Sequence, residues 1–221
     1  MMIIKRRWAS LQQYQTIFYQ SLLALLFSVC SCSAHSATKT LLVLGDSLSA
    51  EYGLARGSGW VALLEQRLME KHIDAKVINA SISGETTSGG KARLPQLLRT
   101  HHPDILLLEL GSNDALRGLS LSASEKNFRD MIQMAQQENT KVLLIGMRIP
   151  PNYGRDYTEQ FFSIFPRLAR ETHSGLVPFL LQGIAENIDY FQNDRIHPLA
   201  SAHPILLNNV WPSLQRLLNQ K

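Results

Sequence analysis

Short apolar runs alternate along this chain with segments of helical periodicity. The runs lie at residues 41–44, 76–79, 105–108 and 142–145, with a weaker one at 176–180. Continuous apolar runs of this length are typical of strands that are buried on both faces, as in a parallel sheet. Because Pro178 cannot donate to a strand ladder, we expect the fifth strand at an edge of the sheet.

The intervening segments repeat apolar residues every three or four positions, as a helix with one buried face does. These stripes are Val61, Leu64 and Leu68; Leu94, Leu97 and Leu98; Phe128, Met131, Ile132 and Ala135; Phe161, Phe165, Leu168 and Ala169; and Leu207, Val210, Leu214 and Leu217. Ser122 and Glu125 form a capping-box pattern that predicts the start of the third helix. The alternation predicts a three-layer α/β fold with a five-stranded parallel sheet, helices on both faces and a ligand site at the carboxyl ends of the strands.

The N-terminus has the three parts of a secretory signal peptide. Lys5, Arg6 and Arg7 precede an uncharged segment that is most apolar at 22–27, and small residues follow up to Ala37. We expect export with cleavage after Ala34 or Ala37, which leaves residues 38–221 as one domain. An uncleaved anchor fits less well, because polar residues interrupt the apolar run at 17–29 and a span needs about 20 apolar residues.

Both cysteines, Cys30 and Cys32, lie inside this segment. The cleaved protein would therefore have neither a disulfide nor a thiol nucleophile. Lipidation of Cys32 is an alternative that we rank below simple cleavage.

The charge of the chain gives no indication of nucleic-acid binding. There are 22 Lys and Arg against 18 Asp and Glu, but three of the basic residues are Lys5, Arg6 and Arg7. The remainder is nearly balanced and contains no basic stripe with interleaved aromatic residues.

Polar turns follow the predicted strands and contain the elements of an acyl-transfer site. Ser47 comes directly after the first strand, where its hydroxyl would project from a strand-to-helix turn. A serine needs a base to become a nucleophile, and His197 with Asp194 three residues earlier can serve as the base and its orienting carboxylate. The backbone N–H of Ser47, the N–H of Gly84 and the side-chain amide of Asn113 could together bind an oxyanion. Taken singly, each residue also has an ordinary explanation as a turn, cap or surface residue.

The joint order of these motifs resembles the GDSL or SGNH hydrolase family over residues 41–210. The motifs are Gly45-Asp46-Ser47-Leu48, Asn79 to Gly84, Gly111-Ser112-Asn113-Asp114, Pro151 to Gly154 and Asp194 to Pro198. The resemblance is strongest to its bacterial periplasmic thioesterases, lysophospholipases and arylesterases. It implies a flavodoxin-like fold, Ser47 as nucleophile with Asp194 and His197, an oxyanion hole of Ser47, Gly84 and Asn113, no metal or organic cofactor, and a small acyl ester or thioester as substrate. We further expect a monomer with peripheral lipid contact.

Glu51 and the segment 148–155 affect the predicted substrate site. Glu51 stands where the family commonly has a small residue, which leaves the polarity of one pocket wall open. Residues 148–155 contain two prolines and a glycine, and we expect them to cover the substrate, with Ile149 and Tyr153 lining an acyl groove.

Other functions fit the sequence less well than acyl transfer does. A phosphate-binding loop at 84–91 is rejected, because its glycine spacing is wrong and Lys91 is followed by Ala92. A metal site of Asp194, His197 and His203 would lack a further close ligand. The remaining alternatives are a carbohydrate O-deacetylase of the same family and an exported lipid-binding protein without catalytic activity.

Overall fold

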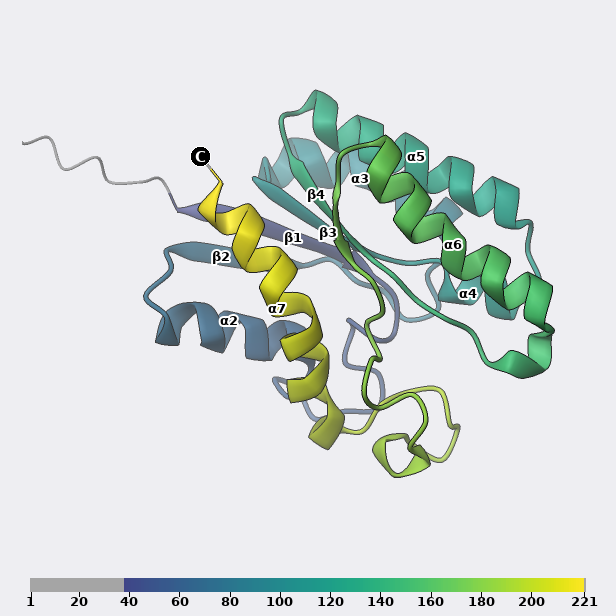
Figure 1. The fold of residues 1–221 in the computed structure, drawn as a ribbon. Helices are drawn as coiled ribbons and strands as arrows, with labels where there is room; N and C mark the ends of the chain where they lie inside the picture. The colour runs from purple at the N-terminus through teal and green to yellow at the C-terminus, as the bar shows by residue number, and fades with distance from the viewer. Residues whose placement is uncertain (1–37, 221) are drawn as a thin grey trace, which may run out of the picture. The chain divides into compact units, whose positions relative to one another are not determined.

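Five parallel strands form the centre of the fold, in the order β2-β1-β3-β4-β5, in a computed structural model that describes residues 38–220 (Figure 1). The strands are β1 (Lys39–Gly45), β2 (Ala75–Asn79), β3 (Ile105–Glu109), β4 (Lys141–Ile145) and β5 (Gly175–Val177). The first four predicted runs fall within strands. The fifth run, 176–180, is a strand only up to Val177, because β5 ends just before Pro178 at the sheet edge. The predicted fold class is therefore confirmed. The predicted signal segment, with its cleavage sites and cysteines, lies outside the described residues.

Helices cover both faces of the sheet, which makes three layers (Figure 1). One face carries α2 (Trp60–Glu70) and α7 (His203–Asn219), and the other carries α3 (Thr87–His101), α5 (Leu121–Gln137) and α6 (Arg155–Glu171). Shorter elements lie in the loops: α4 (Ser112–Leu116), η1 (Pro151–Tyr153), η2 (Ile188–Tyr190) and η3 (Ala200–Ala202). No helix in the described part of the chain is both long and apolar enough to cross a bilayer.

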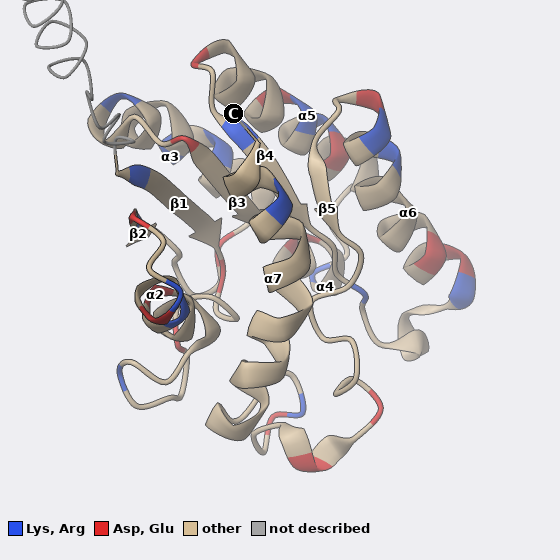
Figure 2. Cartoon of the chain, turned by 60° about the vertical axis from the view of Figure 1, so that its left-hand side comes forward, with Lys and Arg blue, Asp and Glu red and all other residues tan. Residues whose placement is uncertain are grey.

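The predicted apolar stripes form the core. Every residue of these stripes is buried except Leu97, which packs half-buried at the margin. Phe165 lies edge-on to Phe128 and Phe161, with ring centroids 5.6 and 5.3 Å apart, a geometry favoured between aromatic rings. Charged residues of both signs are interspersed along α2, α5 and α6 (Figure 2).

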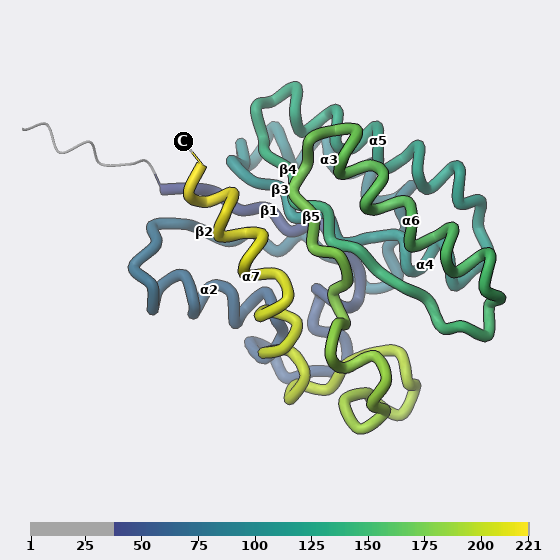
Figure 3. The backbone as a smooth tube through the Cα atoms, viewed as in Figure 1, coloured from purple at the N-terminus to yellow at the C-terminus, as the bar shows by residue number. Residues whose placement is uncertain are grey.

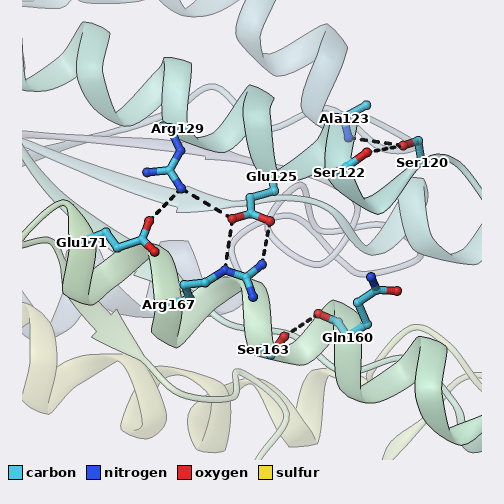
Figure 4. Close-up of polar contacts among 9 residues, drawn as sticks. All are labelled: Ser120, Ser122, Ala123, Glu125, Arg129, Gln160, Ser163, Arg167 and Glu171. Carbon is cyan, nitrogen blue, oxygen red and sulfur yellow. Dashed lines mark hydrogen bonds and ion pairs between the residues drawn. The ribbon is translucent and has the colours of Figure 1, made fainter.

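The predicted start of the third amphipathic helix is wrong by two residues. The N-cap of α5 is Ser120, whose hydroxyl accepts the Ala123 N–H at 3.3 Å, and Ser122 already lies in the first turn. Glu125 does not reach back to cap the helix. Its carboxylate accepts two hydrogen bonds from Arg167 on α6, at 2.6 and 3.1 Å (Figure 4). A charge-assisted bidentate pair with the neighbouring helix is stronger than a bond to a neutral backbone N–H, so tertiary contact decides the position of this carboxylate.

Candidate active site

The loops that follow the strands bring the predicted site residues to one edge of the sheet. Residues 46–59 follow β1, and the long segment 178–202 between β5 and α7 returns to the same edge (Figure 3). The two segments are joined where the Gln192 side-chain amide donates to the Tyr52 carbonyl at 2.9 Å. Parallel strands present their carboxyl ends together, which explains why loops distant in sequence meet here.

Ser47, His197 and Asp194 form a continuous hydrogen-bonded relay. The His197 Nε2 lies 2.8 Å from the Ser47 Oγ, and its Nδ1 lies 2.7 Å from the Asp194 Oδ2. The other carboxylate oxygen of Asp194 accepts the backbone N–H groups of Ile196 and His197 at 2.9 and 3.0 Å. A base within hydrogen-bond reach of a serine, itself oriented by a carboxylate, is the arrangement that activates a serine nucleophile.

The Asp194 carboxyl is held in its ionised form. Partial burial alone would raise its pKa, but hydrogen bonds from the His197 backbone and ring and from the Ile196 N–H outweigh that effect and lower the pKa to about 2. Asp194 therefore carries a negative charge at neutral pH. That charge favours the imidazolium that forms when His197 takes a proton.

The turn after β1 presents Ser47 with its backbone N–H unoccupied. Asp46 builds this turn, because its side chain accepts the Leu48 N–H at 3.0 Å and its carbonyl accepts two further backbone N–H groups. Within the described residues, the N–H groups of Ser47 and Gly84 donate no hydrogen bond. Both are thus available to an oxyanion. Gly84 has a φ of 80°, a left-handed conformation that glycine adopts without strain.

Asn113 lies in the first turn of α4, beside the nucleophile turn. Its amide nitrogen donates to the Asp46 Oδ2 and to the Glu85 carbonyl, each at 3.0 Å. Both amide protons are engaged in this state, so an oxyanion bound here must share one of them with its present acceptor. The Asp46 carboxylate is the acceptor that fixes the amide next to Ser47.

Two buried carboxyl groups beneath Ser47 were missed by the sequence analysis. Burial raises the pKa of Asp46 to about 6, against the opposing effects of the Leu48 N–H, His197 and Asn113. Glu109, the last residue of β3, is fully buried, and its Oε2 accepts the Ser49 hydroxyl at 2.7 Å and the Asp46 N–H at 3.3 Å. Its Oε1 has no partner among the described residues.

Burial, and then the nearby Asp46 charge, raise the pKa of Glu109 well above its ordinary value. The sequence held a signal for this pair, because Glu109 is the one charged residue at the end of an otherwise apolar run, 105–110. A carboxyl group in such a run must be buried or must end the strand.

The structure answers the question that the sequence raised about Glu51. This residue has a left-handed backbone, with a φ of 60°. Its carboxylate turns back onto its own loop, where it accepts the Gly57 and Gly59 N–H groups at 3.0 and 2.7 Å. The next residue, Tyr52, places its ring 4.3 Å from that of His197, a contact that the sequence analysis missed.

The two predicted groove residues have different environments. Ile149 is buried in the main core, whereas Tyr153 in η1 is 40% exposed and donates its hydroxyl to the Leu116 carbonyl at 3.2 Å. Their role in substrate binding stays a prediction. Asp194, His197 and His203 do not form a metal site. The His203 Nδ1 accepts the Trp60 N–H, and the described residues contain no cluster of three metal-ligating side chains.

Comparison with known proteins shows which protein family and which enzymes this chain resembles. The sequence model of the GDSL-like Lipase/Acylhydrolase family matches residues 43–205. The chain is 46% identical over 199 residues to "Esterase TesA" of Pseudomonas aeruginosa, covering 88% of this chain and 99% of that protein. It is 41% identical over 197 residues to "Thioesterase 1/protease 1/lysophospholipase L1" of Escherichia coli, covering 89% and 93% of the two chains.

A solved structure supports the same grouping. The psychrotrophic esterase EstA from Pseudoalteromonas sp., inhibited by monoethylphosphonate, superposes with a TM-score of 0.78 at 39% identity. The match covers 82% of this chain and 100% of that structure.

Proposed function

Because the chain belongs to the GDSL-like lipase/acylhydrolase family, we propose that it hydrolyses acyl esters and thioesters through an acyl-enzyme intermediate on Ser47. The observation that carries the proposal is the relay from the Ser47 Oγ through both nitrogens of His197 to Asp194, with links of 2.8 and 2.7 Å. A lipid-binding protein without catalytic activity would have no need for this relay.

The reaction proceeds in two acyl transfers. His197 takes the Ser47 proton as the serine oxygen attacks the carbonyl carbon, and Asp194 stabilises the imidazolium. The developing oxyanion accepts the Ser47 and Gly84 N–H groups and a proton of the Asn113 amide. Collapse returns the proton to the leaving alcohol or thiol, and water then repeats the sequence to release the acid.

We infer that the ester or thioester substrate carries an apolar acyl chain. The exposed large apolar side chains of the described residues, except Met69, all lie on connections that run from the end of a strand to the next long helix, short helices included. They are Tyr52, Ile82, Leu119, Tyr153, Ile188, Ile196 and Leu199. An apolar rim at the edge that carries Ser47 would contact acyl chains or a lipid surface. Tyr153 and Ile149 are proposed to set the preferred chain length.

Export is part of the same proposal. The basic, apolar and small-residue regions of segment 1–37 support a cleaved signal peptide and a periplasmic or secreted enzyme. The intact mass of the secreted protein would identify cleavage after Ala34 or Ala37. A lipid on Cys32 would instead indicate an anchored form.

Covalent labelling of Ser47 tests the mechanism. A fluorophosphonate should form an adduct on Ser47 that peptide mass mapping detects, and S47A should lose both the adduct and turnover of p-nitrophenyl esters, acyl-CoAs and lysophospholipids. S83A is the matched control, because Ser83 is an exposed serine at the same edge. H197A should be nearly as damaging as S47A, and D194A less so, because Asp194 orients and stabilises the base. Wild-type hydrolysis by folded S47A would refute the proposal, and preferential release of acetate from acetylated sugars would indicate the O-deacetylase instead.

A further inference from the structure

His203 is a buried histidine outside the proposed relay, at the first position of α7. It is 2% exposed and lies six residues after His197. Its Nδ1 accepts the backbone N–H of Trp60, the first residue of α2, at 2.9 Å. The imidazole therefore joins the start of α2 to the segment that carries His197.

The hydrogen bonds of the ring identify its protonation state. Because Nδ1 accepts a hydrogen bond, the proton of the neutral ring lies on Nε2. Burial lowers the pKa of His203, while the Pro198 carbonyl and the Glu51 charge act in the opposite direction. At neutral pH the neutral ring thus accepts the Trp60 N–H at its Nδ1.

The start of α2 depends on such distant partners. Its N-cap is Gly59, which has no side chain to cap the helix. The Gly59 N–H is bound by Glu51, and the Trp60 N–H is bound by His203. First-turn N–H groups have no partner within their own helix, so a buried one without a hydrogen bond is costly.

Neighbouring residues of these two segments contact the imidazole of His197 and the residue after it. Tyr52, next to Glu51, packs against the His197 ring, and Gln192 donates to both the Tyr52 and Pro198 carbonyls at 2.9 and 3.3 Å. Loss of the His203 link would separate the start of α2 from the start of α7, which follows the segment that carries His197. A displacement of about 1 Å at a catalytic group can reduce turnover about 100-fold.

We propose that His203 is a positioning residue, which holds His197 in register with Ser47 by tying the start of α7, six residues after His197, to the start of α2. The inference rests on the proposed hydrolase function. It requires a hydrogen-bond acceptor on a buried side chain that reaches the Trp60 N–H, and a glutamine supplies one. Leucine fills a similar volume and supplies none.

The test compares H203Q with H203L. N208A is the control, because Asn208 makes a second α2–α7 hydrogen bond, to Arg67 at 2.8 Å, at an exposed position. The measurements are kcat and KM for a p-nitrophenyl ester, the rate of fluorophosphonate labelling of Ser47 and thermal unfolding. We expect H203L to lower kcat and the labelling rate at least about tenfold with KM changed less than about threefold. H203Q and N208A should stay within about threefold of the wild type.

Each other outcome overturns the inference. Labelling of folded H203L at the wild-type rate would do so, as would H203Q being as impaired as H203L. Should H203L not fold, H203A takes its place, because alanine offers no acceptor to the Trp60 N–H, and wild-type kinetics in H203A would equally refute the role. A wild-type protein that is not labelled at Ser47 would instead disprove the proposed function, which separates the two failures.

Discussion

Replacing Asp46 with asparagine should impair catalysis through Asn113 without destabilising the protein. The Asp46 Oδ2 accepts the Asn113 amide at 3.0 Å, while the Oδ1 accepts the Leu48 N–H at 3.0 Å. In D46N the oxygen can keep the Leu48 bond, which turns the new amide group towards the Asn113 amide. Two donors then face each other, and Asn113 loses the acceptor that fixes its orientation.

The size of the effect follows from two limits. A hydrogen bond to a charged group contributes about 1.5–3 kcal/mol, equivalent to about 10-fold to 100-fold in rate if all of it is lost in the transition state. Removal of a complete oxyanion donor costs about 10²–10³ in kcat, which sets the upper limit for any effect that acts through Asn113. We therefore expect D46N to lower kcat about 10-fold to 100-fold with little change in KM.

A double-mutant cycle with N113A provides the assay. If Asp46 acts through Asn113, D46N should have little further effect on kcat once the amide is absent, so the double variant should resemble N113A. Equal losses in both backgrounds would refute the reasoning, because Asp46 would then act on another group.

Thermal unfolding of D46N provides a second, independent measurement. The pKa of Asp46 is raised from 3.8 to about 6 in the folded protein, so folding favours its protonated form. The resulting stabilisation is present below about pH 4 and is lost as the pH rises through 6. Above pH 6 the charged side chain lowers the free energy of unfolding, and D46N removes that charge. D46N should hence unfold at the wild-type temperature or above it at pH 7.5, while losing activity.

Two further predictions concern neighbouring residues. E109Q should become more stable than the wild type in urea unfolding as the pH rises above the ordinary titration range of glutamate, because a carboxyl group with a raised pKa loses its stabilising contribution as the pH rises. A stability difference between the two proteins that does not change with pH would contradict the raised pKa of Glu109. Y153A should shift the ratio of kcat/KM between short and medium p-nitrophenyl acyl esters, and an unchanged ratio would show that Tyr153 does not contact the acyl chain. I149A should shift the same ratio and also lower the free energy of unfolding by about 2–5 kcal/mol, because it truncates a buried side chain.

Much of the fold and site was predictable because both follow from local sequence patterns. Strands buried on two faces require apolar residues at successive positions, and β1 and β3 satisfy this at Leu41–Leu44 and at Ile105–Leu108. Once the strands are known, the turns after them must meet at one edge. Ser47 and Asn113 could therefore be assigned to a common site without any knowledge of their contacts.

The residues that the sequence did not predict depend on contacts between distant segments. Glu109 meets Asp46 only because β1 and β3 pair in the register that places Gly45 opposite Glu109. No sequence pattern indicates a partner for His203, because its bond to Trp60 depends on how α7 packs against α2. Glu125 satisfied a local capping pattern, yet a guanidinium on α6 binds it more strongly than its own helix start.

The position of Asp46 imposes a trade-off between stability and catalysis at this edge of the sheet. Its carboxylate is costly because the ends of β1 and β3 exclude water, and an unpartnered oxygen on Glu109 adds to that cost. The same exclusion of water strengthens the hydrogen bond with which Asp46 orients Asn113. A neutral residue would relieve the first effect and abolish the second, so the stabilising substitution at position 46 is also the one that disorders the oxyanion donor. The buried charge is therefore best explained by catalysis, because the fold alone would be more stable without it.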